Sequence, residues 1–386
     1  MAHTTTEHPP SRRANPYHRV AVVGAGAWGT ALAALARRAG AEVALWGRDA
    51  ETVGSIAGPG RTTPYLPGVE LPEGVAATTD LACALRNAEI VLVVVPSQAV
   101  RALCAEMAPY LDPGVPVALC AKGIEGGSGL LMTQVAREVL GDRPVGVLSG
   151  PTFAREVALG LPTAATVSFE FNYHDRLDPQ DSPAARLAVT LSTADFRAYI
   201  SDDVIGVEVA GAIKNVIAIA CGMMTGAGFA ENTRAALITR GVDEMKRLAE
   251  TLGGRRETIT GLAGIGDLTL TCSSPTSRNL SYGIQLGEGV PADETFGGAQ
   301  VVVEGAENSK TVTDLARRVG LHLPICEAVR AVLFDGAPMK ESFAGLWSAP
   351  IQAEPRSMDL TVDHPTAYRS PGPDPRPRPR SDPPKE

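Results

Sequence analysis

The sequence lacks the cysteine patterns of a zinc site. Its six cysteines, spread over 386 residues, form no CxxC pair and no other spacing typical of zinc ligands. Most of them lie in apolar surroundings, which predicts reduced thiols in the core of a cytoplasmic protein. We therefore expect no bound metal; the cysteines are Cys83, Cys104, Cys120, Cys221, Cys272 and Cys326.

Apolar leaders, membrane spans and a basic charge balance are missing as well. The first 18 residues contain His, Pro, Thr and Arg but no apolar core of a signal peptide. The most apolar stretch, residues 206–222, is marginal for a membrane span at 17 residues. The formal net charge of −8 argues against a nucleic-acid platform. A hydrophobic fraction of 44% suits two globular domains.

What is present begins with a glycine-rich turn between a strand and a helix. Residues 19–23 (RVAVV) predict a buried strand, which leads directly into segment 24–29 and an alanine-rich helix. In a GxGxxG motif placed in this way, Gly24 allows the tight turn and Gly26 lets a pyrophosphate approach the backbone. Gly29 lets the helix pack closely on the strand, and the helix N-terminus faces the phosphates. The motif predicts a dinucleotide-binding site.

The choice of nucleotide depends on the end of the second predicted strand, residues 42–46. An NAD-specific site usually places an acid there to hold the ribose hydroxyls, whereas this sequence continues with Gly47 and Arg48. An arginine at this position can pair with the 2′-phosphate of NADP. We therefore favour NADPH, with NADH also possible because Asp49 is adjacent. A solvated surface role is the alternative for Arg48.

Further strands alternate with helices along the first half of the chain. The β-branched run over residues 90–95 predicts a strand covered on both faces, as in a parallel sheet. Ligands bind outside the carboxyl ends of such strands, where Lys122 and the loop 149–152 fall, although both could be plain turn residues. The polar segment 170–182 predicts an exposed insertion. The other predicted strands are residues 115–121, 145–148, 164–169 and 195–200.

The second half is organised around residues 206–222 (GVEVAGAIKNVIAIACG). A helix that is apolar on nearly all sides is typical of a buried central helix, and residues 201–203 offer capping oxygens before it. Lys214 is then a cation in dry surroundings, which must find partners or lose its proton. Such a lysine suits proton transfer. The alternative is a lysine that extends to the surface and only solubilises the helix.

Two later segments add an acid and an anion site. Asp267 stands in the apolar, glycine-rich segment 260–268 and needs a cationic partner, for which Lys214 is the candidate. Segment 272–279 gathers hydroxyls, Arg278 and Asn279 at a helix start, which predicts a phosphate or carboxylate site. A capping role for Asp267 and an exposed Arg278 are the alternatives. Further helices are predicted over residues 231–251, 280–287, 308–319 and 325–334.

The predicted fold class is α/β, with an N-terminal Rossmann-type dinucleotide-binding domain over residues 18–200 and an all-α substrate domain over residues 201–346. Residues 1–17 and the Pro- and Arg-rich residues 347–386 cannot bury enough apolar surface to fold, so we expect two disordered tails. A role of the second tail as a proline-rich ligand rests on composition alone.

An ordered series of motifs covers residues 20–333. It includes GAGAWGTALA, LWGRD, YLPG, AKGIE, SGPTFAREV, DVIGVEVAGAIKNVIAIA, GLAGIGDLTLTC, SRN and VVEG. In these motifs the chain resembles the bacterial NAD(P)-dependent glycerol-3-phosphate dehydrogenase family. The resemblance implies reversible reduction of dihydroxyacetone phosphate to sn-glycerol 3-phosphate, the backbone precursor of phospholipids, by a cytoplasmic enzyme that uses NADPH or NADH. A homodimer is one option for its assembly.

The resemblance also implies roles for single residues. Lys214 matches the proton donor and acceptor, and Asp267 matches a substrate-site acid beside it. Further substrate-contacting positions are matched by Lys122, Gly150, Thr152, Ser277, Arg278 and Asn279. Cofactor-contacting positions are matched by Gly24, Gly26, Ala27, Trp28, Gly29, Arg48, Lys122, Ala154, Arg278, Val302 and Glu304.

Three positions depart from the family pattern, and two other functions compete. Ala27 stands where the family often has Ser, Thr62 replaces a common Asn, and Ala210 replaces a Gly, but none removes a group that the reaction needs. One rival is a two-domain dehydrogenase acting on 6-phosphogluconate or a 3-hydroxy acid. The other is a nucleotide-sensing regulator without turnover, which the presence of Lys214, Asp267 and Arg278 disfavours.

Overall fold

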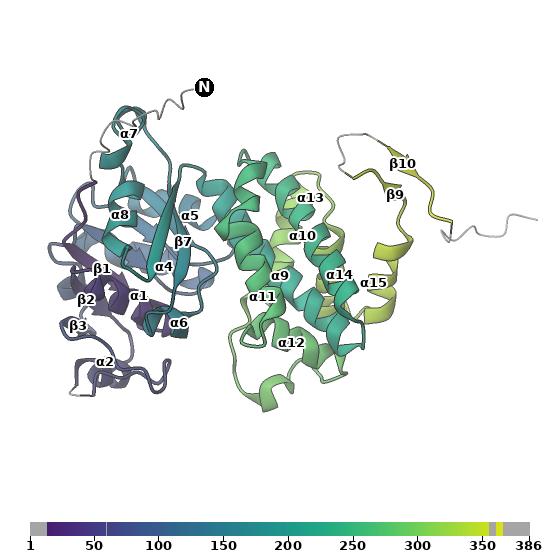
Figure 1. The fold of residues 1–386 in the computed structure, drawn as a ribbon, viewed down its shortest axis with the longest axis horizontal. Helices are drawn as coiled ribbons and strands as arrows, with labels where there is room; N and C mark the ends of the chain where they lie inside the picture. The colour runs from purple at the N-terminus through teal and green to yellow at the C-terminus, as the bar shows by residue number, and fades with distance from the viewer. Residues whose placement is uncertain (1–13, 59, 355–359, 366–386) are drawn as a thin grey trace, which may run out of the picture.

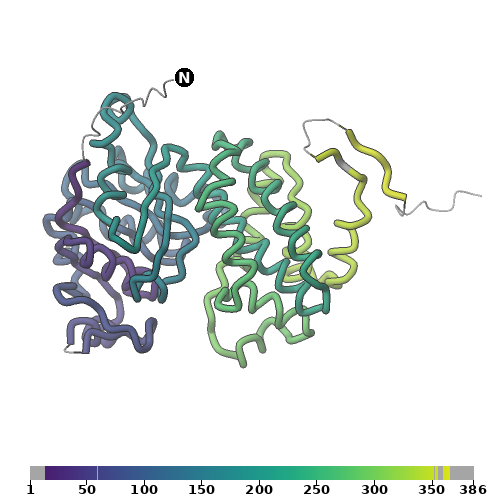
Figure 2. The backbone as a smooth tube through the Cα atoms, in the orientation of Figure 1, coloured from purple at the N-terminus to yellow at the C-terminus, as the bar shows by residue number. Residues whose placement is uncertain are grey.

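The computed structural model describes residues 14–58, 60–354 and 360–365. Two bodies lie side by side in it, an α/β domain formed by the first half of the chain and a helical domain formed by the second (Figure 1). The backbone tube shows the second body as a bundle of roughly aligned helices (Figure 2). The predicted fold class is confirmed.

The first domain is built on one eight-stranded sheet in the order β3-β2-β1-β4-β5-β6-β7-β8. Strands from β3 to β6 are parallel to their neighbours, and β7 pairs antiparallel to β6. The short strand β3 lacks a clear apolar alternation, and the sequence did not predict it. The strands are β1 (Arg19–Val23), β2 (Glu42–Trp46), β3 (Val75–Thr78), β4 (Ile90–Val93), β5 (Val117–Leu119), β6 (Val145–Ser149), β7 (Thr163–Phe169) and β8 (Phe196–Ser201).

Helices cover both faces of this sheet. Val20 and Val22 of β1 pack in the apolar layer that includes α1 and α8, whereas Ala21 and Val23 face the layer of α4 and α5. This alternation is the period of two that a strand imposes. The helices are α1 (Ala27–Arg38), α2 (Ala50–Ala57), α3 (Leu81–Leu85), α4 (Val100–Met107), α5 (Met132–Leu140), α6 (Ala154–Ala158), α7 (Tyr173–Leu177) and α8 (Pro183–Leu191).

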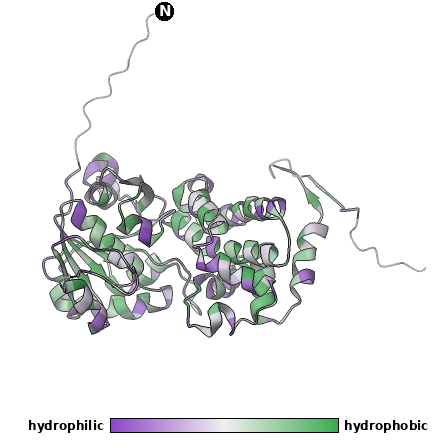
Figure 3. Cartoon of the chain, turned by 60° about the horizontal axis from the view of Figure 1, so that its bottom comes forward, coloured by the Kyte–Doolittle hydropathy of each residue, from purple (hydrophilic) through white to green (hydrophobic). Residues whose placement is uncertain are grey.

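The second domain surrounds one apolar helix, α9 (Val204–Gly226), which is buried at every residue from Gly206 to Met224. Its N-cap, Asp203, accepts a hydrogen bond from the backbone N–H of Gly206. Within the described residues, α9 is long and apolar enough to cross a membrane, but 94% of its apolar window is buried inside the protein. The hydropathy colouring shows green helices meeting inside this bundle (Figure 3). The surrounding helices are α10 (Glu231–Thr251), α11 (Asp267–Ser273), α12 (Arg278–Gly287), α13 (Glu304–Arg318) and α14 (Pro324–Phe334).

Helices α9 and α12 approach closely because glycines line both sides of their contact. A Cβ atom at Gly222 would lie 2.3 Å from the Leu280 carbonyl oxygen, and one at Gly283 would lie 2.3 Å from the Ile219 carbonyl oxygen. No side chain fits at such distances, so glycine is required for this approach. The contact fixes the start of α12 beside the middle of α9, where Lys214 lies.

The ends of the chain differ in part from the predicted tails. Tyr17 is 3% exposed and its backbone N–H donates to the Thr190 hydroxyl, so the folded domain includes this residue. Helix α15 (Met339–Ser348) leads into a hairpin of β9 (Ile351–Gln352) and β10 (Thr361–Val362), which projects from the helical domain (Figure 1). The rest of both predicted tails, residues 1–13, 355–359 and 366–386, lies outside the described residues. The predicted insertion 170–182 carries α7 and is mostly exposed, although Asp175 and Ser182 are buried.

Candidate active site

Three charged side chains from three elements meet where the two domains join. Lys214 lies on α9, Asp267 begins α11, and Lys122 follows β5 of the first domain. Lys214 Nζ lies 2.8 Å from Asp267 Oδ1, and Lys122 Nζ lies 2.7 Å from Asp267 Oδ2. The side chains of Lys214, Lys122 and Asp267 are 7%, 17% and 3% exposed. The predicted pairing of Lys214 with Asp267 is confirmed, and the same carboxylate also holds a second ammonium group.

The proton affinities of the three groups follow from burial and from this sharing. Burial raises the pKa of Asp267, but the two lysine charges outweigh it and hold that pKa below its usual range. Burial lowers the pKa of Lys214 to about 8, opposed by Asp267 and assisted by the positive charge of Lys122. Burial also lowers the pKa of Lys122, but the charge of Asp267 outweighs burial and raises it. Lys214 is therefore the amine of the pair that can exchange a proton near neutral pH.

The backbone before α11 aims Asp267 at the lysines. A π-helical turn, Leu262–Gly266, runs directly into α11, and Asp267 is the first residue of that helix. One turn further, the Thr271 hydroxyl accepts from Lys214 Nζ at 2.9 Å and donates to the Asp267 backbone oxygen at 2.6 Å. The i, i+4 spacing puts both side chains on one face of α11. The Asp267 side chain therefore binds lysines rather than capping its helix.

Amide side chains join the starts of α12 and α13 to α9. The Asn279 side chain donates to Asn215 Oδ1 at 3.0 Å and accepts from the Gly305 backbone N–H at 3.0 Å. The Asn215 side chain in turn donates to Glu304 Oε2 at 3.2 Å. Asn279, predicted to contact substrate, and Glu304, predicted to contact cofactor, thus both belong to a network beside Lys214.

The glycine turn has the shape that a dinucleotide needs. A Cβ atom at Gly24 would lie 2.2 Å from the Val94 carbonyl oxygen, and one at Gly29 would lie 1.8 Å from the Gly24 carbonyl oxygen. At Gly26, the N-cap of α1, no atom lies within 4 Å of such a Cβ. The first turn of α1 carries no acid and its N-cap makes no side-chain hydrogen bond, so no capping side chain occupies its backbone N–H groups. These residues fit a bound pyrophosphate; Ala27 and Trp28, both partly exposed, follow in the same turn.

The residues that follow β2 are Gly47, where an acidic side chain does not fit, and the exposed Arg48. A Cβ atom at Gly47 would lie 2.7 Å from Ala25 Cβ, so a larger side chain is excluded directly after the strand. Asp49 accepts from the Thr52 backbone N–H and caps α2. Arg48 is exposed and, within the described residues, has no hydrogen bond or ion pair.

The loop after β6 comes close to Lys122. Gly150 has φ +154°, and a Cβ there would lie 2.9 Å from Ala165 Cα, so this position requires glycine. Thr152 and Ala154 are partly exposed in the same loop and at the start of α6. The Ser149 hydroxyl is buried without a hydrogen-bond partner. A Cβ at Gly211 of α9 would lie 3.6 Å from that hydroxyl and 3.3 Å from Lys122 Cγ, so the loop and Lys122 meet α9 at the same place.

The start of α12 carries the predicted anion site. Ser277 is buried and caps the helix by accepting from the Leu280 backbone N–H at 3.3 Å. Arg278 is exposed at the first helical position and has no side-chain partner within the described residues. Val302, a predicted cofactor contact, is 54% exposed just before α13. Within the described ranges, no three His, Cys, Asp or Glu side chains are grouped as metal ligands.

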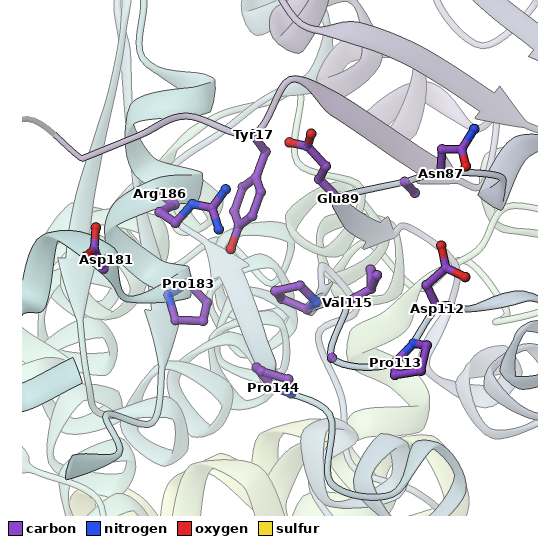
Figure 4. A pocket seen from close by; sticks show the side chains of 13 residues that line it. Tyr17, Asn87, Glu89, Asp112, Pro113, Val115, Pro144, Asp181, Pro183 and Arg186 are labelled. Carbon is purple, nitrogen blue, oxygen red and sulfur yellow. The ribbon is translucent and has the colours of Figure 1, made fainter. Parts of the chain in front are cut away.

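A pocket of about 530 Å³ lies at the amino ends of the parallel strands, opposite to the lysines (Figure 4). It is lined by residues that precede the parallel strands, among them Tyr17 before β1, Glu89 before β4 and Pro144 before β6. Arg186 stacks on the Tyr17 ring, with its Cζ 4.0 Å from the ring centroid. The lysines and the glycine turn lie at the carboxyl ends of the strands, where open α/β sheets bind ligands, so this pocket is separate from the site.

Sequence reasoning missed three polar residues of the site. Thr271 follows Asp267 at i+4, a spacing that would have placed it on the same face of a helix. Asn215 interrupts the apolar stretch next to Lys214, which would have marked it as partnered. Asn308 is buried on α13 among Thr311, Val312 and Leu315, and only the packing shows what it contacts.

An open glycine turn on a Rossmann sheet, joined to a helical domain that brings a buried lysine to the carboxyl edge of the sheet, defines a two-domain NAD(P)-dependent oxidoreductase. Two family descriptions match the chain, the NAD-dependent glycerol-3-phosphate dehydrogenase N-terminus over residues 19–174 and its C-terminus over residues 203–344. The chain therefore belongs to the NAD-dependent glycerol-3-phosphate dehydrogenase family.

Similar proteins cover nearly the whole folded part. A glycerol-3-phosphate dehydrogenase (NAD(P)+) of Rhodospirillum rubrum is 46% identical over 348 residues, which is 90% of this chain and 97% of the relative. The one of Caulobacter vibrioides is 45% identical over 338 residues, with 88% and 99% covered. The crystal structure of glycerol-3-phosphate dehydrogenase from Coxiella burnetii superposes with a TM-score of 0.79 at 38% identity, covering 86% of this chain and 99% of that one. The predicted family and NAD(P) dependence are confirmed.

Proposed function

We propose that Lys214 is the proton donor in the reversible reduction of dihydroxyacetone phosphate to sn-glycerol 3-phosphate, which is the reaction of the family to which the chain belongs. One observation carries this proposal: a buried ammonium group with a pKa of about 8 lies on a carboxylate at the carboxyl edge of a dinucleotide-binding sheet. A bound reduced nicotinamide supplies the hydride. Protonated Lys214 gives its proton to the ketone oxygen and stabilises the charge that develops there.

The other residues of the cluster hold this lysine in place. Asp267 fixes Lys214 and keeps it oriented, and Lys122 on the other carboxylate oxygen brings a second positive charge toward the ketone oxygen. In the reverse direction neutral Lys214 accepts the proton of the alcohol. Because its pKa is near neutrality, both forms are available at physiological pH.

The substrate phosphate is assigned to the start of α12. Arg278 is exposed and has no side-chain partner in the described part of the chain, and the N-terminus of a ten-residue helix attracts negative charge. Binding energy from the phosphate orients the ketone without taking part in the chemistry. The proposed substrate residues are Lys122, Gly150, Thr152, Lys214, Asp267, Ser277, Arg278 and Asn279.

The cofactor is proposed to be NADPH in preference to NADH. Gly47 excludes an acid at the end of β2, Asp49 is already used as a helix cap, and Arg48 is free to pair with a 2′-phosphate. The proposed cofactor residues are Gly24, Gly26, Ala27, Trp28, Gly29, Arg48, Lys122, Ala154, Arg278, Val302 and Glu304.

The cellular setting is also a proposal. The product is the backbone of glycerophospholipids, so we propose a role at the start of lipid synthesis. The free, mostly buried cysteines support a cytoplasmic location. A homodimer is proposed on the exposed Tyr199 and Ile200 of β8, a strand at the edge of the sheet that could meet a second copy. Light scattering on the purified chain measures its mass, and a monomer at micromolar concentration would contradict the dimer.

Steady-state kinetics with both reduced nicotinamides tests the function. We expect oxidation of NADPH with dihydroxyacetone phosphate, with a higher kcat/KM than for NADH. Dihydroxyacetone, which lacks the phosphate, is the matched control and should be a poor substrate. Turnover of 6-phosphogluconate or a 3-hydroxy acid with NADP+, without turnover of dihydroxyacetone phosphate, would favour the rival dehydrogenases instead.

A further inference from the structure

Asn308 joins the two segments that carry the lysines. This residue lies in the second turn of α13 and is 2% exposed. Its side-chain amide donates to the Lys122 backbone oxygen at 2.8 Å and to the Ala212 backbone oxygen at 3.2 Å. Lys122 belongs to the first domain, whereas Ala212 precedes Lys214 by two residues on α9. One buried amide thus ties the backbones of both lysine segments together across the domain boundary.

The loop that Asn308 holds has little freedom to move. A Cβ at Gly123, directly after Lys122, would lie 2.7 Å from Ser97 Oγ and 3.0 Å from Asn308 Oδ1. The Lys122 stem also lies against Gly211 of α9. Asn308 therefore packs on the loop and also donates hydrogen bonds to it. A smaller side chain would leave a gap, and the Lys122 and Ala212 carbonyl groups would each lose a hydrogen-bond donor.

The charge of Lys122 matters to Lys214 because both amines share one carboxylate. The charged groups that face Lys214 are Asp267 on α11, Lys122 on the loop after β5, and Glu304 on α13. Asp267 and Glu304 favour the ammonium form, and Lys122 opposes it. The buried Cys272 thiol of α11 lies within electrostatic range of the same lysine. A change in the position of Lys122 thus changes the protonation of Lys214.

We propose that Asn308 is a positioning residue that fixes the Lys122 loop against α9 and thereby keeps the Lys122 ammonium on Asp267 beside Lys214. Its role in turnover rests on the proposed function. The side chain itself touches neither amine, and it acts through the place that it gives to Lys122. Loss of Asn308 lets the Lys122 amine move away, so Lys214 holds its proton up to a higher pH.

The pH dependence of ketone reduction tests this role. In Asn308→Ala we expect a lower kcat. We also expect the pH at which kcat falls to half on the alkaline side, here called the midpoint, to lie about 0.5–1 pH unit above that of the wild type. Lys122→Met, which removes the opposing charge directly, should raise the midpoint by about 1–2 units. Ser309→Ala is the matched control, because Ser309 is also fully buried on α13 but its hydroxyl, among the described residues, donates to the Ala306 backbone oxygen of its own helix. Its midpoint should equal that of the wild type.

A double variant separates positioning from general loosening. If Asn308 acts through Lys122, Asn308→Ala combined with Lys122→Met should have the midpoint of Lys122→Met alone. An unchanged midpoint in Asn308→Ala, alongside a raised one in Lys122→Met, would overturn the proposal. If Asn308→Ala does not fold, Asn308→Ser keeps one donor and should give a smaller shift in the same direction; no shift there counts against the role.

A measurement without turnover distinguishes failure of this inference from failure of the proposed function. The chain has only six lysines, so selective 13C labelling of lysine gives few signals to assign by NMR. The signal of Lys214 is identified by its loss in Lys214→Ala. We expect it to titrate near pH 8 in the wild type and higher in Asn308→Ala, whichever ketone the enzyme reduces. Equal titration in both proteins would refute the inference even for an active enzyme.

Discussion

Two buried carboxylates at the domain boundary, Asp267 and Glu208, have pKa values that are shifted in opposite directions. They are 2% and 6% exposed. Two lysine charges hold the pKa of Asp267 below its usual range despite burial. Burial raises the pKa of Glu208 to about 7, and the hydrogen bonds from neutral Thr133 and the charge of Arg137 offset this rise only in part.

The difference shows that partners, and not burial alone, decide whether a buried acid keeps its charge. Asp267 stays ionised and holds two amines where a ketone would be reduced. Glu208 lies on α9 less than two turns before Lys214, yet it binds the start of α5 in the first domain. Asp267 binds the two lysines proposed for the chemistry, and Glu208 joins the domains.

Removal of Lys214 gives the largest expected effect and tests whether the Asp267 cluster is the reacting one. In Lys214→Ala, ketone reduction should fall by about 10²- to 10⁴-fold, because a positioned proton donor contributes that much. Asp267 keeps Lys122 as a counter-charge, so the far-UV circular dichroism spectrum should be unchanged. Turnover near the wild-type value would contradict the catalytic role of Lys214. Asp267 would then differ from Glu208 in its charge but not in a role in the reaction.

Removal of the Asp267 charge tests whether this carboxylate stabilises the two buried ammonium groups. Asp267→Asn leaves two buried ammonium groups without a counter-charge, and the free energy of unfolding should fall by about 3–5 kcal/mol. Urea unfolding followed by fluorescence measures this change. Asp314→Asn, which breaks a partly exposed pair with Arg330, is the control and should cost less than about 1 kcal/mol. Equal losses in the two variants would show that the lysines do not depend on Asp267.

The proposed role of Lys214 as proton donor predicts the pH dependence of the reaction. Its pKa is lowered to about 8, and only the ammonium form donates a proton. Ketone reduction should therefore fall about tenfold per pH unit above this value, whereas alcohol oxidation should rise toward it from below. Stopped-flow or steady-state rates between pH 6 and 10 (about the range in which a lysine near 8 titrates) measure both limbs. If the pH profiles of ketone reduction and alcohol oxidation do not cross near pH 8, a group other than Lys214 transfers the proton.

The smallest expected effect concerns Glu208. Its folded pKa of about 7 exceeds the usual 4.5, so its contribution to stability is complete below about pH 4.5 and is lost as the pH rises through 7. Glu208→Gln cannot ionise, so between those pH values its free energy of unfolding should fall by about 2–3 kcal/mol less than that of the wild type.

Glu244→Gln is the matched variant for this experiment. Glu244 is equally buried, binds the start of α14 within the second domain, and also has its pKa raised to about 7 by burial. Both variants should therefore flatten the pH dependence of urea unfolding. A Glu208→Gln profile that follows the wild type would show that Glu208 ionises without cost, which would remove the contrast with Asp267.

Local features of the fold could be predicted because a few neighbouring residues decide them. The strand 19–23, the glycine turn after it, and the helix 231–251 occur where their sequence patterns predict them. Asp203 caps α9 as expected from its place before an apolar run. The strand β3 was missed because three of its four residues are only partly buried, one is exposed, and the sequence has no distinct pattern there.

The amino-acid sequence by itself determined the dinucleotide turn, the apolar central helix with its single lysine, and the need of Asp267 for a cation. These follow from spacing, backbone freedom and the cost of burying charge, which act within a few residues. Only the tertiary structure decided that Asp267 binds two lysines, that Glu208 accepts hydrogen bonds from neutral Thr133, and that Asn308 bonds to the Lys122 loop. Those partners lie 53 to 186 residues apart, and no local pattern records which of them the packing of two domains brings together.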